Sequence, residues 1–109
     1  MIITVTDSDF AEKVIHTKKP TIVDLWAPWC QPCKALEKEL QKLEITFGNK
    51  LTIAKVNIDQ NPKTVAWLDI KTVPTLLFYN GKSSAPTAMH GGSTAELITA
   101  KFRLREATA

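Results

Sequence analysis

The most informative part of this chain is VDLWAPWCQPCK at residues 23–34. It begins within a nearly continuous apolar segment, residues 21–26, and contains two cysteines three positions apart, Cys30 and Cys33. Such an apolar run is typical of a strand buried on both faces. From about Cys30 to Phe47 the apolar side chains recur at spacings of four, three and four, which predicts a long helix. The cysteines are therefore expected where a buried strand passes into a helix.

Before and after these residues, apolar patterns and turn signals predict four further strands and three further helices. The expected strands are residues 2–5, 21–26, 51–58, 75–79 and about 87–89, and the helices are residues 8–16, about 30–47, a short one from Asn61 and Pro62, and 93 to about 105. Asp7 or Ser8 is the expected N-cap of the first helix. The order β-α-β-α-β-α-β-β-α predicts an α/β fold with a central mixed sheet covered by helices on both faces. The length of 109 residues predicts one domain over residues 1–109.

Composition and charge exclude several classes of protein. Hydrophobic residues make up 44% and charged residues 23%, which is typical of a globular domain rather than a disordered chain. The net charge is +3, but the lysines are scattered, so we expect no nucleic-acid partner. No apolar run is long enough to span a membrane. The first ten residues include Asp7 and Asp9 and have no cationic start, so we expect a cytoplasmic protein.

Cys30 and Cys33 are the only cysteines, and their spacing favours redox chemistry. A disulfide that closes so short a loop stabilises a fold by only about 2 kcal/mol, so a purely structural role is disfavoured. A structural zinc site needs four ligands, and the chain could add only His16 and His90. We therefore expect no metal site, and interpret the pair as a reversible dithiol and disulfide.

The two cysteines are expected to have different roles. Cys30 would begin a helix, where free backbone N–H groups and the helix dipole stabilise a thiolate. An ordinary thiol is only about 3% ionised at pH 7, so a lower pKa would raise the nucleophilic fraction more than tenfold. Pro32 suits the first helical turn, where its missing N–H costs nothing. Cys30 is thus the expected nucleophile, and Cys33, inside that turn, is the expected resolving cysteine.

The same stretch resembles the active-site segment of the thioredoxin family, Trp-Cys-Gly-Pro-Cys-Lys preceded by Val-Asp-Phe-Trp-Ala. The resemblance continues through KVNID at residues 55–59, TVPT at 72–75 and FYNG at 78–81, and covers nearly the whole chain. It implies the thioredoxin fold and a protein-disulfide reductant that works through Cys30-Gln-Pro-Cys33. It also implies a monomer without metal or bound organic cofactor, which receives electrons from NADPH through a thioredoxin reductase and passes them to disulfide-containing target proteins.

Asp24 and Lys55 match two further positions of the family. Asp24 matches a buried acid that assists proton transfer at Cys33, and an acid inside an apolar strand supports this interpretation. Lys55 matches a lysine that neighbours this acid and modulates it. The alternatives are an acid and a lysine on exposed strand faces.

The resemblance also implies a surface that binds the substrate. Pro74 matches a cis-proline against the cysteines, and the backbone of Val73 matches the position that pairs an extended substrate segment. The apolar docking surface that it implies comprises Trp29, Ile58, Val73 and Met89. Trp26 matches the second family tryptophan and is expected in the core.

Departures from the family keep alternative functions open. Gln31 stands where the family usually has glycine, and the two residues between the cysteines tune the reduction potential. Pro32, where oxidants and isomerases commonly have histidine, favours a reductant. His90, if it faces the cysteines, would lower the pKa of Cys30. The alternatives are an oxidant or isomerase of the same fold, or a non-catalytic thioredoxin-like binding module.

Overall fold

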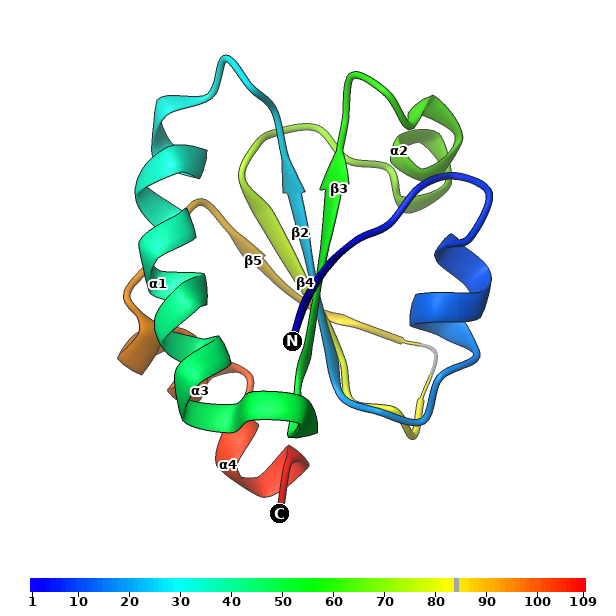
Figure 1. The fold of residues 1–109 in the computed structure, drawn as a ribbon. Helices are drawn as coiled ribbons and strands as arrows, with labels where there is room; N and C mark the ends of the chain where they lie inside the picture. Colours follow the sequence, from blue (N-terminus) through cyan, green and yellow to red (C-terminus); the bar gives the residue numbers. More distant parts are fainter. Residues whose placement is uncertain (84) are drawn as a thin grey trace.

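The computed structural model describes residues 1–83 and 85–109 and contains one five-stranded sheet flanked by helices (Figure 1). The strands are β1 (Ile2–Thr4), β2 (Thr21–Trp26), β3 (Thr52–Asn57), β4 (Thr75–Tyr79) and β5 (Thr87–His90). The helices are a π-helix η1 (Ala11–Ile15), α1 (Gln31–Phe47), a 3-10 turn η2 (Gly48–Lys50), α2 (Pro62–Leu68), α3 (Ala95–Lys101) and α4 (Leu104–Ala107). The predicted fold class and order of elements are confirmed.

The sheet is mixed, with the strand order β1-β3-β2-β4-β5. β3 pairs in parallel with β1 and β2, whereas β4 pairs antiparallel with β2 and β5. β2 lies in the middle, and five of its six residues are buried, as its apolar sequence predicts. Because β4 runs against β2, the start of β4 lies at the same end of the sheet as the end of β2. This topology brings the loops before Cys30 and before Thr75 together.

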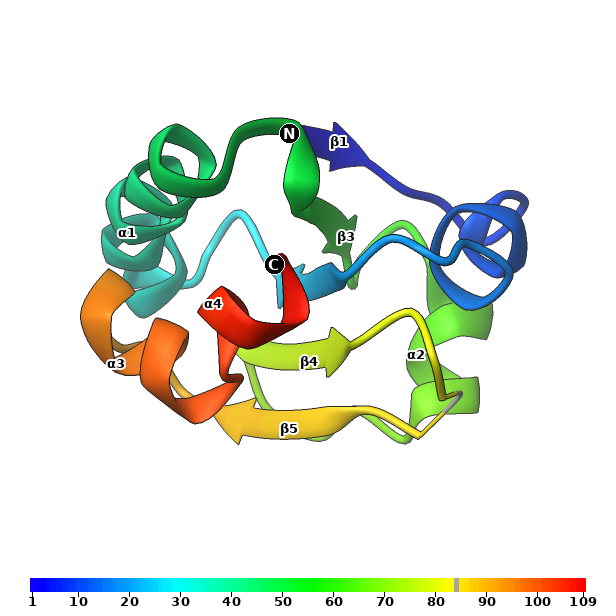
Figure 2. The ribbon, with the colours of Figure 1, turned by 90° about the horizontal axis from the view of Figure 1, so that it is seen from below.

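Each face of the sheet has its own apolar core, and helices cover both faces (Figure 2). On one face α1, α3, α4 and the turn between the last two contribute Leu36, Leu40, Leu43, Phe47, Ile98, Phe102 and Leu104. On the other face Phe10 and Val14 of the first helical segment pack against the strands, with Leu68 of α2 at the edge. Within residues 1–83 and 85–109, no helix is both long enough and apolar enough to cross a bilayer.

The first and last helical segments differ from the prediction. The first is a short π-helix that begins at Ala11 rather than at residue 8. The last is two helices, because Arg103 adopts a left-handed conformation with φ of 52° between α3 and α4. Thr94 caps α3, since its hydroxyl accepts a hydrogen bond from the N–H of Leu97 at 3.2 Å. The single helix expected over residues 93 to about 105 is therefore two short helices that change direction at Arg103.

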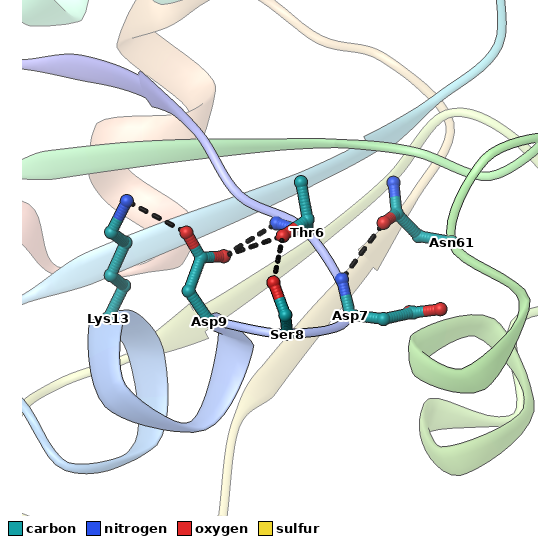
Figure 3. A network of polar contacts seen from close by, with 6 residues as sticks. All are labelled: Thr6, Asp7, Ser8, Asp9, Lys13 and Asn61. Carbon is teal, nitrogen blue, oxygen red and sulfur yellow. Dashed lines mark hydrogen bonds and ion pairs between the residues drawn. The ribbon is translucent and has the colours of Figure 1, made fainter.

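Asp7 caps α2 rather than the first helix. Its carboxylate accepts hydrogen bonds from the N–H and hydroxyl of Thr64, at 2.8 and 2.7 Å, and from the N–H of Lys63. Figure 3 shows the backbone N–H of Asp7 donating to the side chain of Asn61, the residue before α2. Asp9 binds Thr6 and Lys13 in the same network. The loop after β1 is thus fastened to a helix more than fifty residues away.

Candidate functional site

β2 passes into α1 at one end of the sheet (Figure 1). Cys30 and Cys33 lie at this junction and are joined by a disulfide. Cys30 is the N-cap of α1, and its Sγ accepts a hydrogen bond from the backbone N–H of Cys33 at 3.2 Å. Gln31 and Pro32 are exposed in the first turn, whereas both cysteines are buried in the disulfide form. A sulfur in this position receives the helix N–H groups and the positive end of the dipole, which stabilise a thiolate.

A small apolar cluster surrounds the disulfide. Ala27 and the two cysteines form its buried part, and Trp26, Ile58 and Val73 pack against it. The Val73–Pro74 peptide bond is cis, as the family resemblance implies. Pro74 is held by its carbonyl oxygen, which accepts a hydrogen bond from the N–H of Gly91 at 2.8 Å. Three separate loops therefore meet around the sulfur atoms.

Trp29 is 66% exposed beside Cys30, which agrees with its expected place on the surface. Its indole N–H donates to the carboxylate of Asp59, at 3.2 Å to Oδ2 and 3.4 Å to Oδ1. This hydrogen bond holds the indole nitrogen near Asp59 while the ring remains open to solvent. Asp59 had no role assigned from the sequence, although it is the last residue of the KVNID stretch and lies just after β3.

Asp24 lies in β2 and is only 2% exposed. A cavity of about 270 Å³ connects it with Cys33; the other lining residues are Trp26, Ala27, Pro28, Lys34, Glu37 and Lys55. Burial raises the pKa of the Asp24 carboxyl from 3.8 to about 7, while the nearby charge of Lys55 lowers it and that of Glu37 raises it. Its Oδ1 atom has no hydrogen-bond partner among the described residues. A carboxyl that titrates near neutral pH can both accept and return a proton.

Lys55 faces the same cavity, from the position on β3 opposite Asp24. Its ammonium nitrogen lies 4.9 Å from the centre of the Trp26 ring and forms an ion pair with Glu37 of α1. The lysine is thus near the acid, as expected, but its ion pair is with another residue. Glu37 was not identified from the sequence, although its place four residues after Cys33, one turn along the same helix, was a signal that could have found it.

Met89 of the expected docking surface lies in β5 and is half-buried. In β5 it stands opposite Leu76 and packs against the core cluster beneath α1 and α3. Its neighbour His90 stands opposite Thr75 and is exposed. Because successive strand residues point to opposite faces, Met89 faces the side of the sheet covered by α1 and α3, and His90 faces the other side.

The described residues offer no alternative metal centre. Across residues 1–83 and 85–109, no three His, Cys, Asp or Glu side chains gather closely enough to hold a metal ion. The redox-active group of the site is the cysteine pair itself. A mixed sheet of this topology with a Cys-x-x-Cys disulfide at its strand-to-helix junction defines a thiol-disulfide oxidoreductase.

The chain belongs to the thioredoxin family. The family model described as Thioredoxin matches residues 1–103. The thioredoxin of Buchnera aphidicola subsp. Acyrthosiphon pisum is 38% identical over 96 residues, which cover 88% of this chain and 89% of that protein. The thioredoxin of Rhodospirillum rubrum is 39% identical over 83 residues, covering 76% and 80%. Chloroplastic thioredoxin z has the same fold, with a TM-score of 0.87 over 97% of this chain and 95% of that one, at 22% identity.

Proposed function

We propose that this oxidoreductase acts as a reductant of protein disulfides, with Cys30 as the nucleophile and Cys33 as the resolving cysteine. The observation that carries the proposal is the placement of the Cys30 sulfur at the N-terminus of α1, where it accepts the N–H of Cys33. That environment favours the thiolate of Cys30 over that of Cys33. Pro32 between the cysteines also supports a reductant, because it adds no positive charge beside the sulfur.

Reduction of a target would take two exchange steps. The Cys30 thiolate attacks one sulfur of the target disulfide, forms a mixed disulfide, and releases the other target sulfur as a thiolate. Cys33 then gives its proton to Asp24 and attacks Cys30, so that the Cys30–Cys33 disulfide forms and the second target thiolate leaves. Two electrons pass to the target. The cavity that links Cys33 with the buried carboxyl of Asp24 supports this proton transfer.

The surface around the disulfide would bind the target. Trp29 is exposed and its indole N–H is hydrogen-bonded to Asp59, and Val73 packs beside the cysteines just before Pro74. An exposed aromatic side chain next to a reactive group provides apolar contact area for a partner protein. We therefore assign Trp29, Val73 and Pro74 to target binding and Gln31 and Pro32 to tuning of the potential. Within this proposal the chain is a cytoplasmic monomer, recycled by a thioredoxin reductase that uses NADPH.

Trapping of the mixed disulfide tests the proposed roles. Cys33→Ser, reduced and then incubated with insulin as a model disulfide protein, should accumulate a covalent adduct at Cys30 that mass spectrometry detects. Cys30→Ser is the matched control and should trap much less. Equal trapping by both variants would overturn the assignment of nucleophile and resolving cysteine, and a binding module without exchange chemistry would trap nothing.

The reduction potential distinguishes a reductant from an oxidant or isomerase. Equilibration of the wild-type protein with dithiol buffers at pH 7 should give a value near the reducing end of the range, about −270 mV, rather than above about −200 mV. A value above about −200 mV would reassign the protein as an isomerase or oxidant.

The role of Trp29 in target binding is tested by substitution. Trp29→Ala should slow the reduction of insulin without changing the reduction potential. Trp67→Ala, at a tryptophan that is 65% exposed, is the control and should change neither the rate nor the potential.

A further inference from the structure

Glu37 reaches the proton-transfer cavity from the same helix as the resolving cysteine. Cys33 and Glu37 are four residues apart on α1, so they occupy the same side of the helix one turn apart. Both line the cavity that contains Asp24. The side chain of Glu37 is 47% exposed, so this carboxylate lies at the boundary between the cavity and solvent.

Lys55 is placed to neutralise Asp24, but it forms an ion pair with Glu37 instead. The two strands pair Asp24 directly with Lys55, and in a parallel pair such residues project to the same face of the sheet. The ammonium of Lys55 nevertheless contacts Glu37 Oε1. Among residues 1–83 and 85–109, no ion pair joins Lys55 to Asp24, and Asp24 Oδ1 has no hydrogen-bond partner. The buried acid therefore has no direct ion pair with Lys55, and the charge of Lys55 lowers its pKa only from beyond ion-pair distance.

We propose that Glu37 is a positioning residue, which holds the Lys55 ammonium away from Asp24 and thereby sets the pH at which Asp24 exchanges its proton with Cys33. The proposal rests on the proposed role of Asp24 in proton transfer. Glu37 itself touches neither the sulfur atoms nor the target in this scheme. It acts through Lys55 and through its own negative charge.

The charges around the cavity all bear on this proposal. α1 contributes Lys34 and Glu37 beside Cys33, and β3 contributes Lys55. β4 contributes the apolar Leu76 opposite Asp24. A cation that moved towards Asp24 would favour its charged form, whereas the carboxylate of Glu37 disfavours it. The causes of the raised pKa of Asp24 agree with these signs: burial raises the pKa most, the charge of Lys55 lowers it, and the charge of Glu37 raises it.

Direct titration of Asp24 tests the proposal. The variant Glu37→Gln keeps the shape of the side chain but removes the charge that attracts Lys55. In the oxidised protein, NMR titration of the Asp24 side-chain carboxyl should give a midpoint lowered by about one pH unit. Glu12→Gln is the control, because it makes the same change in net charge on η1, which lies on the other side of the sheet. An unchanged midpoint in Glu37→Gln, or an equal decrease in Glu12→Gln, would overturn the proposal.

A double variant shows whether Glu37 acts through Lys55. If it does, Glu37→Gln should lower the Asp24 midpoint by less in a Lys55→Gln background than in the wild-type background. Equal decreases in both backgrounds would mean that only the charge of Glu37 matters, which would overturn the positioning role. Glu37→Asp keeps the charge, so its Asp24 midpoint should stay close to the wild-type value. This variant also tests whether the fold tolerates a change at this position.

The test is separate from that of the proposed function. Titration reads the proton affinity of Asp24 and does not require exchange with a target. If the wild-type protein reduces insulin but the midpoint of Asp24 ignores Glu37, only the present inference is wrong. If Glu37→Gln shifts the midpoint while Asp24→Asn leaves the pH profile of insulin reduction unchanged, the proposed role of Asp24 is wrong.

Discussion

Replacing Asp24 with asparagine removes a charge that the folded protein has to bury. Burial raises the pKa of this carboxyl from 3.8 to about 7, against the opposing charge of Lys55. In the unfolded chain the carboxyl is in water and loses its proton near its ordinary value. Between about pH 4 and pH 7 the folded protein therefore binds one more proton than the unfolded chain does.

The sign and size of the effect follow from this difference. Because the folded state binds the extra proton, the free energy of unfolding falls as the pH rises through this window and becomes level above it. Each pKa unit corresponds to about 1.4 kcal/mol, so ionised Asp24 costs about 4 kcal/mol at high pH. Asn does not ionise. The free energy of unfolding of Asp24→Asn, relative to that of the wild-type protein, should therefore rise by about 4 kcal/mol between pH 4 and pH 8.5.

Guanidinium chloride unfolding of the oxidised proteins, followed by tryptophan fluorescence at several pH values, measures this gain. Asp69→Asn is the control, because Asp69 is exposed after α2 and its left-handed conformation suits asparagine. Its stability should follow the wild-type pH dependence. A difference between Asp24→Asn and wild type that is the same at pH 4 and pH 8.5 would refute the argument that burial of the charge controls the stability.

Two further predictions concern packing and capping, and both are read as denaturant midpoints at pH 7. Leu40→Ala should lower the free energy of unfolding by about 3 kcal/mol, because Leu40 is 1% exposed on the buried face of α1. Ile45→Ala, at a position of the same helix that is 84% exposed, should change it by less than about 0.5 kcal/mol. Thr64→Val should cost about 1.5 kcal/mol, because it removes the hydroxyl that donates to Asp7 at 2.7 Å. Equal effects at Leu40 and Ile45, or an unchanged midpoint for Thr64→Val, would contradict these packing and capping arguments.

Features governed by neighbours in the sequence could be predicted without the structure. The apolar run of β2, the helical spacing of α1 and the position of Cys30 between them depend on contacts within a few residues, and all three are confirmed. The mixed sheet followed from the alternation of strands and helices. The cis bond before Pro74 was different, because only resemblance to the thioredoxin family implied it.

Contacts between residues far apart in the sequence decided what the local pattern left open. Asp7 has the side chain of a cap for the nearest helix, yet the fold presents it to α2, whose exposed N–H groups it binds. Met89 and His90 are adjacent in a strand, and pairing with β4 decides which of them enters the core. A shift of one residue would exchange their faces, and the amino-acid pattern of so short a strand does not fix that choice.

The class of chemistry could be predicted without the structure, because two cysteines at a strand-to-helix junction need only local geometry to form a thiolate and a disulfide. The tertiary structure decided the environment of Asp24. Its burial depends on the whole sheet, and the ion pair between Lys55 of β3 and Glu37 of α1 exists only when the helix packs across the strands. Electrostatic energies vary steeply with distance and burial, and both are properties of the folded chain.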